Sequence, residues 1–414
     1  MNRVLKFGGA SIRDSSKIEN VFSILSSYKN EKIVIIFSAI ANVTNLLEEL
    51  VDLHLMNDLR KQHKLVEIHQ IHLNIVKDLF EKNHSIYNKL NNLIDELRII
   101  IDKKPESGYS FIYDQIVSYG ELMSTKILND YLNLRKFNCI LLDARDLVKT
   151  DSKYQNAKID WSSTKKNIKK IKLDSPIITQ GFIGSNTSNQ TTTLGREGSD
   201  FTAAIFANIL NADEVIIWKD VNGVLNADPR YFNDTILLSN LSYSEAIELA
   251  FYGAKVIHPR TIQPLQEKHI PLSVRSFINI NEPGTVIAEI KNNKPITSYI
   301  VKENQVLISI SDINLSFIVE EHLSWIFSVL SKYDISVNLM QNSAVSFSVC
   351  VDNKKNKVLD LVTELSTKFK VYYNNKVKLF TIRHYSEDSI NKVIDGKSVL
   401  LEQKSRNTVQ YVVS

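Results

Sequence analysis

The chain begins with an apolar strand that runs directly into two glycines. Residues Arg3–Phe7 alternate as a buried-edge strand does, Gly8 and Gly9 follow at once, and residues 15–28 have the apolar spacing of a helix. Glycine lets a backbone approach an anion closely, so a strand, a glycine turn and a helix in this order form a cradle for phosphate. Lys6 stands two residues before the turn, where its ammonium could reach a phosphoryl group or face solvent on an ordinary strand.

A second glycine-containing segment precedes another helical pattern. Gly195 and Gly198 permit tight turns, and Arg196 can form paired hydrogen bonds to a carboxylate or phosphate. The helix that starts near Ser199 offers free N–H groups to an anion, and Asp200 in its first turn is expected to point into the site. Such a turn is also typical of a plain helix N-cap, so the anion-binding interpretation depends on the rest of the chain.

The first half of the chain alternates between strands and helices. Apolar runs predict four strands after the first, at residues 32–37, 138–142, 175–181 and 214–218, with a helix over 44–55. This order predicts a doubly wound, mainly parallel α/β sheet, whose ligands gather beyond the carboxyl ends of its strands. Both glycine segments are expected at those ends.

Composition and motifs exclude several classes of protein. The 414 residues are 43% hydrophobic, enough for two or three domains, and the net charge of +4 is mild. The densest basic run, residues 165–172, resembles a solvated helix face, which argues against nucleic acid as a partner. No P-loop segment and no protein-kinase motif set occurs, so phosphate chemistry must use another scaffold.

Cysteine usage and the first residues predict the compartment. Cys139 and Cys350 are isolated, so neither a disulfide framework nor a zinc site is expected. The first strand starts too early to leave room for a leader, and residues 33–37 are too few to span a bilayer. We therefore expect a cytoplasmic protein without a membrane partner.

The composition changes after residues 284–285. The following residues contain almost no glycine and show a repeated strand–helix–strand pattern. Strands are predicted at 305–310, 335–340, 345–351, 376–383 and 398–413, and helices at 318–330, 358–365 and 387–394. This pattern predicts a separate α+β region over residues 296–414.

Seven segments resemble the successive motifs of the aspartokinase family, in the family's order and spacing. They are Lys6–Ser11, Ser38–Ala39 with Thr44–Asn45, Ser118–Ser124, Gly195–Asp200, Trp218–Gly223, Asp228–Arg230 and Phe251–Pro259. The resemblance implies an amino-acid-kinase catalytic domain over residues 1–285. The implied reaction is ATP-dependent phosphorylation of the side-chain carboxylate of L-aspartate to 4-phospho-L-aspartate, the first step towards lysine, threonine, methionine and diaminopimelate.

The resemblance also implies the residues that handle the phosphoryl group. Its transfer to a carboxylate brings two anions together, so the site needs cations and N–H dipoles more than a strong base. Lys6 and the N–H groups of Gly8 and Gly9 would stabilise the transferring group. Asp200 would orient Lys6 or the metal.

Further residues are implied for substrate and nucleotide. Arg196 would bind a carboxylate of aspartate, Glu121 its α-ammonium, and Ser38, Thr44 and Ser199 would add polar contacts. ATP, with Mg²⁺ bridging its β- and γ-phosphates, would be bound by Lys6, Lys219, Asp220, Asp228, Arg230 and Lys255. Ala10 and Lys219 depart from the family pattern, which usually has threonine at both positions.

Residues 57–105 form a helical stretch without glycine, which we interpret as an insertion beside the nucleotide-free side of the sheet. His69 and His72 are three residues apart and could share a helix face, as a metal pair requires. No acidic third ligand is evident, however. We therefore expect His63, His69, His72 and His84 to face solvent.

The region 296–414 resembles two ACT-type modules, which in aspartokinases form a regulatory domain and pack chain to chain. A homodimer or higher homo-oligomer is therefore expected, and a passive dimerisation domain is the alternative. Lysine-sensitive members carry Gly-Phe-Leu and acidic residues where this chain has Glu321–Leu323, Asn338 and Ala344, although Ser343 is kept. A buried ammonium without an anionic partner is costly, so strong lysine feedback is not expected, and threonine or no effector stay open.

Two other functions stay open from the sequence. One is another enzyme of the amino-acid-kinase fold, acting on glutamate, carbamate or a nucleotide, against which Glu121 and the ACT-like tail argue. The other is a catalytically inactive regulatory subunit. Such a subunit would be expected to lack Lys6, Arg196 or Asp200, and all three are present.

Overall fold

The computed structural model describes residues 1–254, 257–290, 295–314 and 316–414. Its contacts divide the chain into two compact units. The first unit comprises Met1–Val224, Leu237–Ile247 and Val256–Lys291, and the second comprises Leu225–Ile236, Glu248–Lys255 and Asn292–Ser414. The second unit thus takes two segments from within residues 1–285.

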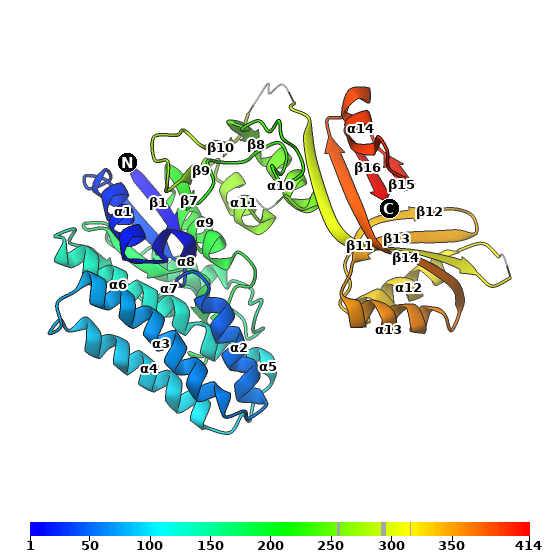
Figure 1. Cartoon of the computed structure of the whole chain (residues 1–414). Coiled ribbons are helices and arrows are strands. Elements are labelled where there is room, and N and C mark those ends of the chain that lie inside the picture. The colour runs from blue at the N-terminus through cyan, green and yellow to red at the C-terminus, as the bar shows by residue number, and fades with distance from the viewer. Residues whose placement is uncertain (255–256, 291–294, 315) are drawn as a thin grey trace. The chain divides into compact units, whose positions relative to one another are not determined.

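An eight-stranded sheet forms the centre of the first unit, and all five strands predicted there lie in it (Figure 1). Neighbouring strands from β3 to β9 run parallel, whereas β10 is antiparallel to β9. The predicted mainly parallel α/β fold is therefore confirmed, and the sequence analysis missed the short strands β8, β9 and β10. The strand order is β3 (Ile140–Leu141), β4 (Ile177–Gln180), β2 (Lys32–Phe37), β1 (Asn2–Phe7), β7 (Glu214–Lys219), β9 (Leu272–Ser276), β10 (Thr285–Ala288) and β8 (Asn240–Ser242).

Both faces of the central strands are buried, because side chains alternate along a strand and helices cover each side. Leu5 and Phe7 on one face join a large apolar cluster with helices that precede β3. Val4 and Ile36 on the other face are also fully buried, and α9 (Gly198–Leu210) contacts β1, β2 and β7. The helices of the first cluster are α1 (Ser15–Ser26), α2 (Val43–Leu55), α5 (Tyr109–Val117) and α6 (Tyr119–Leu134), with the inserted pair described next.

Two helices, α3 (Arg60–Leu79) and α4 (Ile86–Asp102), occupy most of the predicted insertion (Figure 1). Their apolar faces join the same cluster, so they extend the main core of the unit. The expectation of solvent-facing histidines is wrong for His72, which is fully buried with Nδ1 2.7 Å from Ile68 O, and burial lowers its pKa to about 4. His63 is exposed as expected. The expectation rested on the lack of an acidic third ligand, whereas the packing of α3 against α4 and α6 covers His72.

Shorter elements complete the first unit. Most of the basic run 165–172 is exposed on and after α8, as predicted. Within the described ranges, every helix is too short or too polar to cross a membrane. The short elements are η1 (Gly9–Ile12), α7 (Ala144–Leu147), α8 (Trp161–Ile168), β5 (Ile183–Ser185), β6 (Thr191–Thr193), α10 (Tyr243–Tyr252), which also extends into the second unit, and α11 (Pro259–Gln266).

A six-stranded antiparallel sheet forms the second unit, and its repeated strand–helix–strand pattern fits the two predicted ACT-like modules. The long strands β11 (Ser298–Asp312) and β14 (Phe369–Arg383) pair along their length and serve both modules. The sheet order is β12 (Val337–Asn342), β13 (Ser346–Asp352), β11, β14, β16 (Thr408–Val413) and β15 (Val399–Lys404), with helices α12 (Glu320–Lys332), α13 (Lys355–Leu365) and α14 (Glu387–Ile394).

The segment Leu225–Ile236 packs into a hydrophobic cluster of the second unit, together with side chains of β14, α14 and β16. Phe232 is 7% exposed and stacks on Tyr299 with ring centroids 4.8 Å apart. The N–H of Tyr299 donates to Asn226 O over 2.7 Å. This part of the polypeptide therefore folds with strands that lie far later in the sequence.

Candidate active site

A pocket of about 710 Å³ lies at the carboxyl ends of β1, β2 and β7, beside the first turn of α9. Cationic and acidic side chains both line it, so it suits a ligand that carries charges of both signs. Eight predicted site residues contribute to its wall, namely Lys6, Ser38, Thr44, Glu121, Arg196, Ser199, Asp200 and Lys219.

Lys6 and Asp200 form the most buried ion pair of the pocket. Lys6 lies on the face of β1 that α9 covers, and its Nζ is 2.6 Å from Asp200 Oδ1. Lys219 Nζ, at the end of β7, is 3.5 Å from Asp200 Oδ2. Burial alone would raise the pKa of Asp200, but the two ammonium groups together hold it below its ordinary value. Asp200 therefore stays ionised and fixes two cations at the pocket wall.

Stacked aromatic rings fix the strand ends beneath this pair. The Phe7 ring lies 5.5 Å from that of Phe37 and 6.0 Å from that of Trp218, measured between centroids. Phe7 is also the register partner of both residues across the sheet. The ends of β1, β2 and β7 are thus locked side by side, because successive side chains point to opposite faces and the rings occupy the face away from Lys6.

The loop before α9 presents Arg196 to the pocket. Gly195 has a φ of +78°, a left-handed conformation that favours glycine, and the N-cap residue Glu197 is also left-handed with a φ of +53°. Glu197 Oε2 accepts from the His258 N–H over 2.8 Å, which helps to hold the turn. In the described part of the chain the Arg196 guanidinium has no hydrogen-bond or ion-pair partner. It is exposed at the pocket and available to an anion.

Glu121 stands in the first turn of α6 and is 3% exposed. Its Oε1 accepts from the Ala39 N–H over 3.1 Å, whereas Oε2 is buried without a hydrogen-bond partner. Burial raises the pKa of Glu121 to about 8, against the opposing effects of its hydrogen bonds and of Lys6. A buried carboxyl oxygen without a donor is costly, so the site is suited to a ligand that supplies one.

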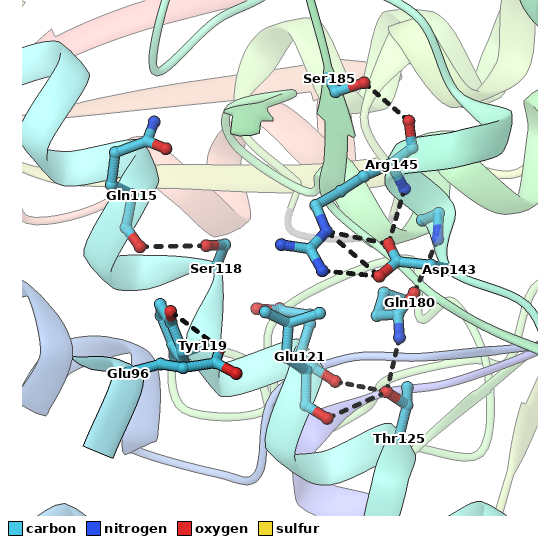
Figure 2. Close-up of polar contacts among 12 residues, drawn as sticks. Glu96, Gln115, Ser118, Tyr119, Glu121, Thr125, Asp143, Arg145, Gln180 and Ser185 are labelled. Atoms are coloured by element: carbon cyan, nitrogen blue, oxygen red, sulfur yellow. Dashed lines mark hydrogen bonds and ion pairs between the residues drawn. The ribbon is translucent and has the colours of Figure 1, made fainter. Parts of the chain in front are cut away.

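Hydrogen bonds anchor this end of α6 to the sheet (Figure 2). Thr125 Oγ1 donates to the Glu121 carbonyl over 2.7 Å and accepts from Gln180 Nε2 over 2.8 Å. Gln180 Oε1 in turn accepts from the Ala144 N–H over 2.8 Å. Because Gln180 is the last residue of β4, these bonds fix the position of Glu121 relative to the carboxyl ends of the strands.

The glycine turn after β1 lies close to the same wall. A Cβ at Gly9 would stand 2.7 Å from Ala39 O, so only glycine fits there without a shift of the backbone. A Cβ at Gly8 would lie 3.5 Å from Lys6 Nζ. Ser38 is held by its N–H, which donates to Phe7 O over 3.2 Å, and by its carbonyl, which accepts from Ser124 Oγ over 2.8 Å.

The structure brings only part of the predicted nucleotide set together. Lys219 lines the pocket, and Asp220 follows it as an exposed residue outside the lining. Asp228 and Arg230 belong to the second unit and form a paired contact, with Arg230 Nη2 2.6 Å and Nε 3.1 Å from Asp228 Oδ2. Lys255 lies outside the described residues. The nucleotide roles of Asp220, Asp228, Arg230 and Lys255 therefore stay predictions.

Several pocket residues were missed by the sequence analysis. Glu48 lies one helical turn after Thr44 on α2, and its Oε1 accepts from Tyr113 Oη over 2.7 Å. The spacing of four residues was a usable signal for Glu48. Nothing in the sequence pattern marked Tyr113, because the pairing of α2 with α5 depends on tertiary packing. The other lining residues that the sequence analysis missed are Gln155 and Phe182, whereas Gly195, Glu197 and Gly198 lie in the segment predicted to bind an anion.

Comparison with known proteins agrees with the fold. The profile of the amino acid kinase family matches residues 1–276. Lysine-sensitive aspartokinase 3 of Escherichia coli (strain K12) is 32% identical over 355 residues, which are 84% of this chain and 78% of that protein. The solved structure of E. coli aspartokinase III with aspartate and ADP in the R-state has a TM-score of 0.85 at 27% identity and covers 100% of this chain and 96% of that one.

Longer relatives are also similar. Bifunctional aspartokinase/homoserine dehydrogenase 2 of Zea mays is 31% identical over 381 residues, or 89% of this chain, and the chain spans 41% of that protein's length. The matched part corresponds to a portion of the bifunctional protein only. The chain belongs to the amino acid kinase family and, within it, to the aspartokinases.

Proposed function

We propose that this chain phosphorylates the side-chain carboxylate of L-aspartate with ATP, giving 4-phospho-L-aspartate and ADP, the first step towards lysine, threonine, methionine and diaminopimelate. The observation that carries the proposal is the buried Glu121 carboxyl with one unpaired oxygen, in the same pocket as Arg196 and the Lys6–Asp200 pair. These groups are suited to an ammonium, a carboxylate and a phosphoryl group respectively. The complex of E. coli aspartokinase III with aspartate and ADP supports the choice of substrates.

The transfer needs charge neutralisation more than a base. A side-chain carboxylate oxygen attacks the γ-phosphorus, the bond from that phosphorus to the bridging oxygen of ADP breaks, and ADP leaves. The attacking carboxylate is already ionised, so no proton must be removed. Lys6 and the N–H groups of Gly8 and Gly9 stabilise the charge on the phosphoryl oxygens, and Asp200 keeps the Lys6 ammonium in place.

Recognition of aspartate rests on two charged groups of opposite sign. Glu121 accepts the α-ammonium and loses its proton as it does so, because a nearby cation favours the ionised carboxyl. Arg196 binds a carboxylate of the substrate with paired hydrogen bonds. Ser38, Thr44 and Ser199 add polar contacts from the pocket wall.

Lys6, Lys219 and Asp220 of the first unit are proposed to bind ATP, and the nucleotide roles of Asp228, Arg230 and Lys255 stay predictions from the family resemblance. Mg²⁺ in such sites takes one or two carboxylates together with substrate phosphates and water, and it would neutralise phosphate charge. Among the described residues no group of three His, Cys, Asp or Glu side chains could hold a metal ion. The exposed carboxylate of Asp220 is better suited than that of Asp200 to bind Mg²⁺, since Asp200 already pairs with two ammonium groups.

We further propose that copies of the chain associate through the second unit and that the protein works in the cytoplasm. Support for association comes from apolar side chains that the second unit exposes, including Phe317 at 70%, Met340 at 51% and Tyr372 at 60%. Deletion of residues 296–414 should then give monomeric or aggregating protein by light scattering.

The test of the proposed function is trapping of the acyl phosphate with hydroxylamine. Purified full chain with Mg-ATP should form a hydroxamate with L-aspartate and far less with L-glutamate. Equal or greater product with glutamate would favour another enzyme of this fold. Absence of ATP turnover with every acidic amino acid would favour an inactive regulatory subunit.

A further inference from the structure

Asp114, on α5, is a buried carboxylate outside the pocket lining. It is fully buried, and its carboxyl oxygens accept three groups: the Thr193 N–H over 2.8 Å, Thr193 Oγ1 over 2.7 Å and the Gln155 N–H over 3.0 and 3.2 Å. No lysine, arginine or histidine in the described ranges lies within ion-pair distance of it. A buried anion held only by hydrogen bonds is costly to the fold, so its presence here points to a role beyond packing.

The two backbone segments that Asp114 joins are those that enclose the Arg196 loop. Thr193 ends β6 and lies two residues before Gly195. A Cβ placed on Gly195 would lie 3.0 Å from Gln155 O and 3.1 Å from Asn156 Oδ1, so the loop turns against residues 155–156. The Ala157 N–H donates to Thr193 O over 3.0 Å, which ties the same two segments together a second time.

Neighbouring contacts extend this support on both sides. Gln115 Nε2 donates to Thr191 O over 2.8 Å, so consecutive residues of α5 hold both ends of β6. Arg260 Nη1 lies 2.6 Å from Asn156 Oδ1 and 3.2 Å from Leu194 O, which braces the start of the loop from the other side. Tyr113, the residue before Asp114, itself lines the pocket.

We propose that Asp114 is a positioning residue for substrate binding: its carboxylate sets the backbone of residues 193–195 and 155–156 so that Arg196 faces the substrate carboxylate. The assignment of Arg196 to the substrate rests on the proposed function, whereas the support of the loop by Asp114 does not. The role requires an acceptor at both carboxyl oxygens, because all three partners are donors. An asparagine of the same shape would turn an N–H₂ group toward a backbone N–H.

The first experiment is Asp114→Asn in the full chain, with steady-state kinetics for each substrate. We expect the KM for aspartate to rise about tenfold or more and the KM for ATP to change less than about twofold, because a lost charge-assisted hydrogen bond displaces one substrate's contacts only. Asp95→Asn, an exposed carboxylate on α4 paired with Arg98, is the matched control and should leave both values unchanged. An equal rise of both KM values, or no rise, would overturn the proposal.

A second variant covers the case in which Asp114→Asn does not fold. Thr193→Val keeps the backbone N–H bond and removes only the hydroxyl donor, so a smaller rise of the aspartate KM, of about threefold, is expected.

The second measurement is independent of the proposed reaction. Without substrates, hydrogen exchange in Asp114→Asn, or in Thr193→Val, should accelerate about tenfold or more in peptides covering residues 153–157 and 193–198 and stay unchanged in α4. Unchanged exchange in the loop would overturn the positioning role even if activity fell. Accelerated exchange in a chain that lacks aspartate kinase activity would support the role of Asp114 and count against the proposed function alone.

Discussion

Two carboxylates, Glu121 at the start of α6 and Asp200 at the start of α9, occupy equivalent places and behave in opposite ways. Both lie in the first turn of a helix, both line the same pocket and both are almost fully buried. Burial raises the pKa of Glu121 to about 8, whereas the pKa of Asp200 lies below its ordinary value. The difference is their partners, since Asp200 pairs with Lys6 and Lys219, whereas Glu121 accepts from the Ala39 N–H and forms no ion pair among the described residues.

The comparison teaches which charges the fold supplies and which it leaves to the ligand. The Lys6–Asp200–Lys219 cluster is complete without substrate and forms a preorganised site for an anion. Glu121 is incomplete until a cation arrives. In the proposed function Asp200 serves phosphoryl transfer and Glu121 serves recognition of aspartate, and each role can be tested apart from the other.

The largest effect is expected on kcat when the Lys6–Asp200–Lys219 cluster loses one of its cations. Lys6→Ala should lower kcat by about two or more orders of magnitude, because a positioned cation in a phosphoryl site contributes several kcal/mol. Steady-state kinetics at saturating substrates measures this. Lys32→Ala, at an exposed position at the start of β2, is the matched control. A purified Lys6 variant that keeps more than about a tenth of the wild-type kcat would show that the role of Lys6 is wrong.

The next largest effect is expected at Glu121, whose carboxyl group has one oxygen without a hydrogen-bond partner. Glu121→Gln should raise the KM for aspartate about tenfold or more, since the α-ammonium loses its anionic partner, and should change the KM for ATP much less. Glu96→Gln is a control at an exposed glutamate, which accepts from Tyr119 Oη over 3.3 Å. If the KM for ATP rose instead, Glu121 would belong to the nucleotide side.

The pKa contrast predicts a difference in how stability depends on pH. A carboxyl whose folded pKa is raised stabilises the fold below its ordinary pKa and loses that contribution as pH rises through the folded pKa. For Glu121 this window runs from about 4.5 to about 8, with a total on the order of several kcal/mol. The lowered pKa of Asp200 acts in the other direction, and its contribution is lost only on acidification below its ordinary value of 3.8.

Thermal unfolding of the unliganded protein between about pH 5 and 8.5 checks this difference. The Tm of the wild type should fall relative to that of Glu121→Gln as pH rises, and saturating aspartate should reduce the gap. Parallel curves for the two proteins would show that Glu121 does not titrate in this range.

The smallest expected effect is inhibition by lysine, because this chain has Asn338 where lysine-sensitive relatives carry a carboxylate. Asn338 Oδ1 accepts from Lys302 Nζ over 2.8 Å, and its Nδ2 donates to Gln305 Oε1 over 2.7 Å and to Asp352 Oδ1 over 2.9 Å. This amide is already engaged and cannot neutralise an ammonium, so lysine should bind at least about tenfold more weakly than to sensitive relatives. Millimolar lysine should inhibit little or not at all.

Inhibition by lysine, threonine and methionine should be measured separately on the intact chain. Asn338→Asp should increase sensitivity to lysine if the missing carboxylate is the cause, and Asn304→Asp on β11 of the same sheet serves as the control. Sub-millimolar inhibition of the wild type by lysine would contradict the argument from the missing carboxylates.

Much of the sheet and part of the pocket could be predicted from sequence, for a physical reason. The carboxyl ends of parallel strands meet at one edge, so Lys6, Ser38 and Lys219 had to approach one another once the strands were recognised. The glycine-rich turn before α9 likewise fixed the neighbourhood of Arg196 and Asp200.

The remaining features depend on contacts between distant helices. The burial of His72 and the contact of Tyr113 with Glu48 follow from how α2 to α6 pack, which periodicity does not encode. Asp114 carried no signal because its partners, Gln155 and Thr193, lie in irregular or short segments. The opposite pKa shifts of Glu121 and Asp200 were also hidden, because they depend on which cations come within reach.

The packing of Leu225–Ile236 within the second unit has a consequence for protein engineering. A chimera made by joining two aspartokinases at one point near residue 290 would keep this segment from one parent and receive its binding surface from the other. Phe232 and Asn226 would then meet foreign partners in place of Tyr299. An exchange of regulatory halves should therefore transfer residues 225–236 and 248–254 along with the C-terminal region, as a graft of three pieces.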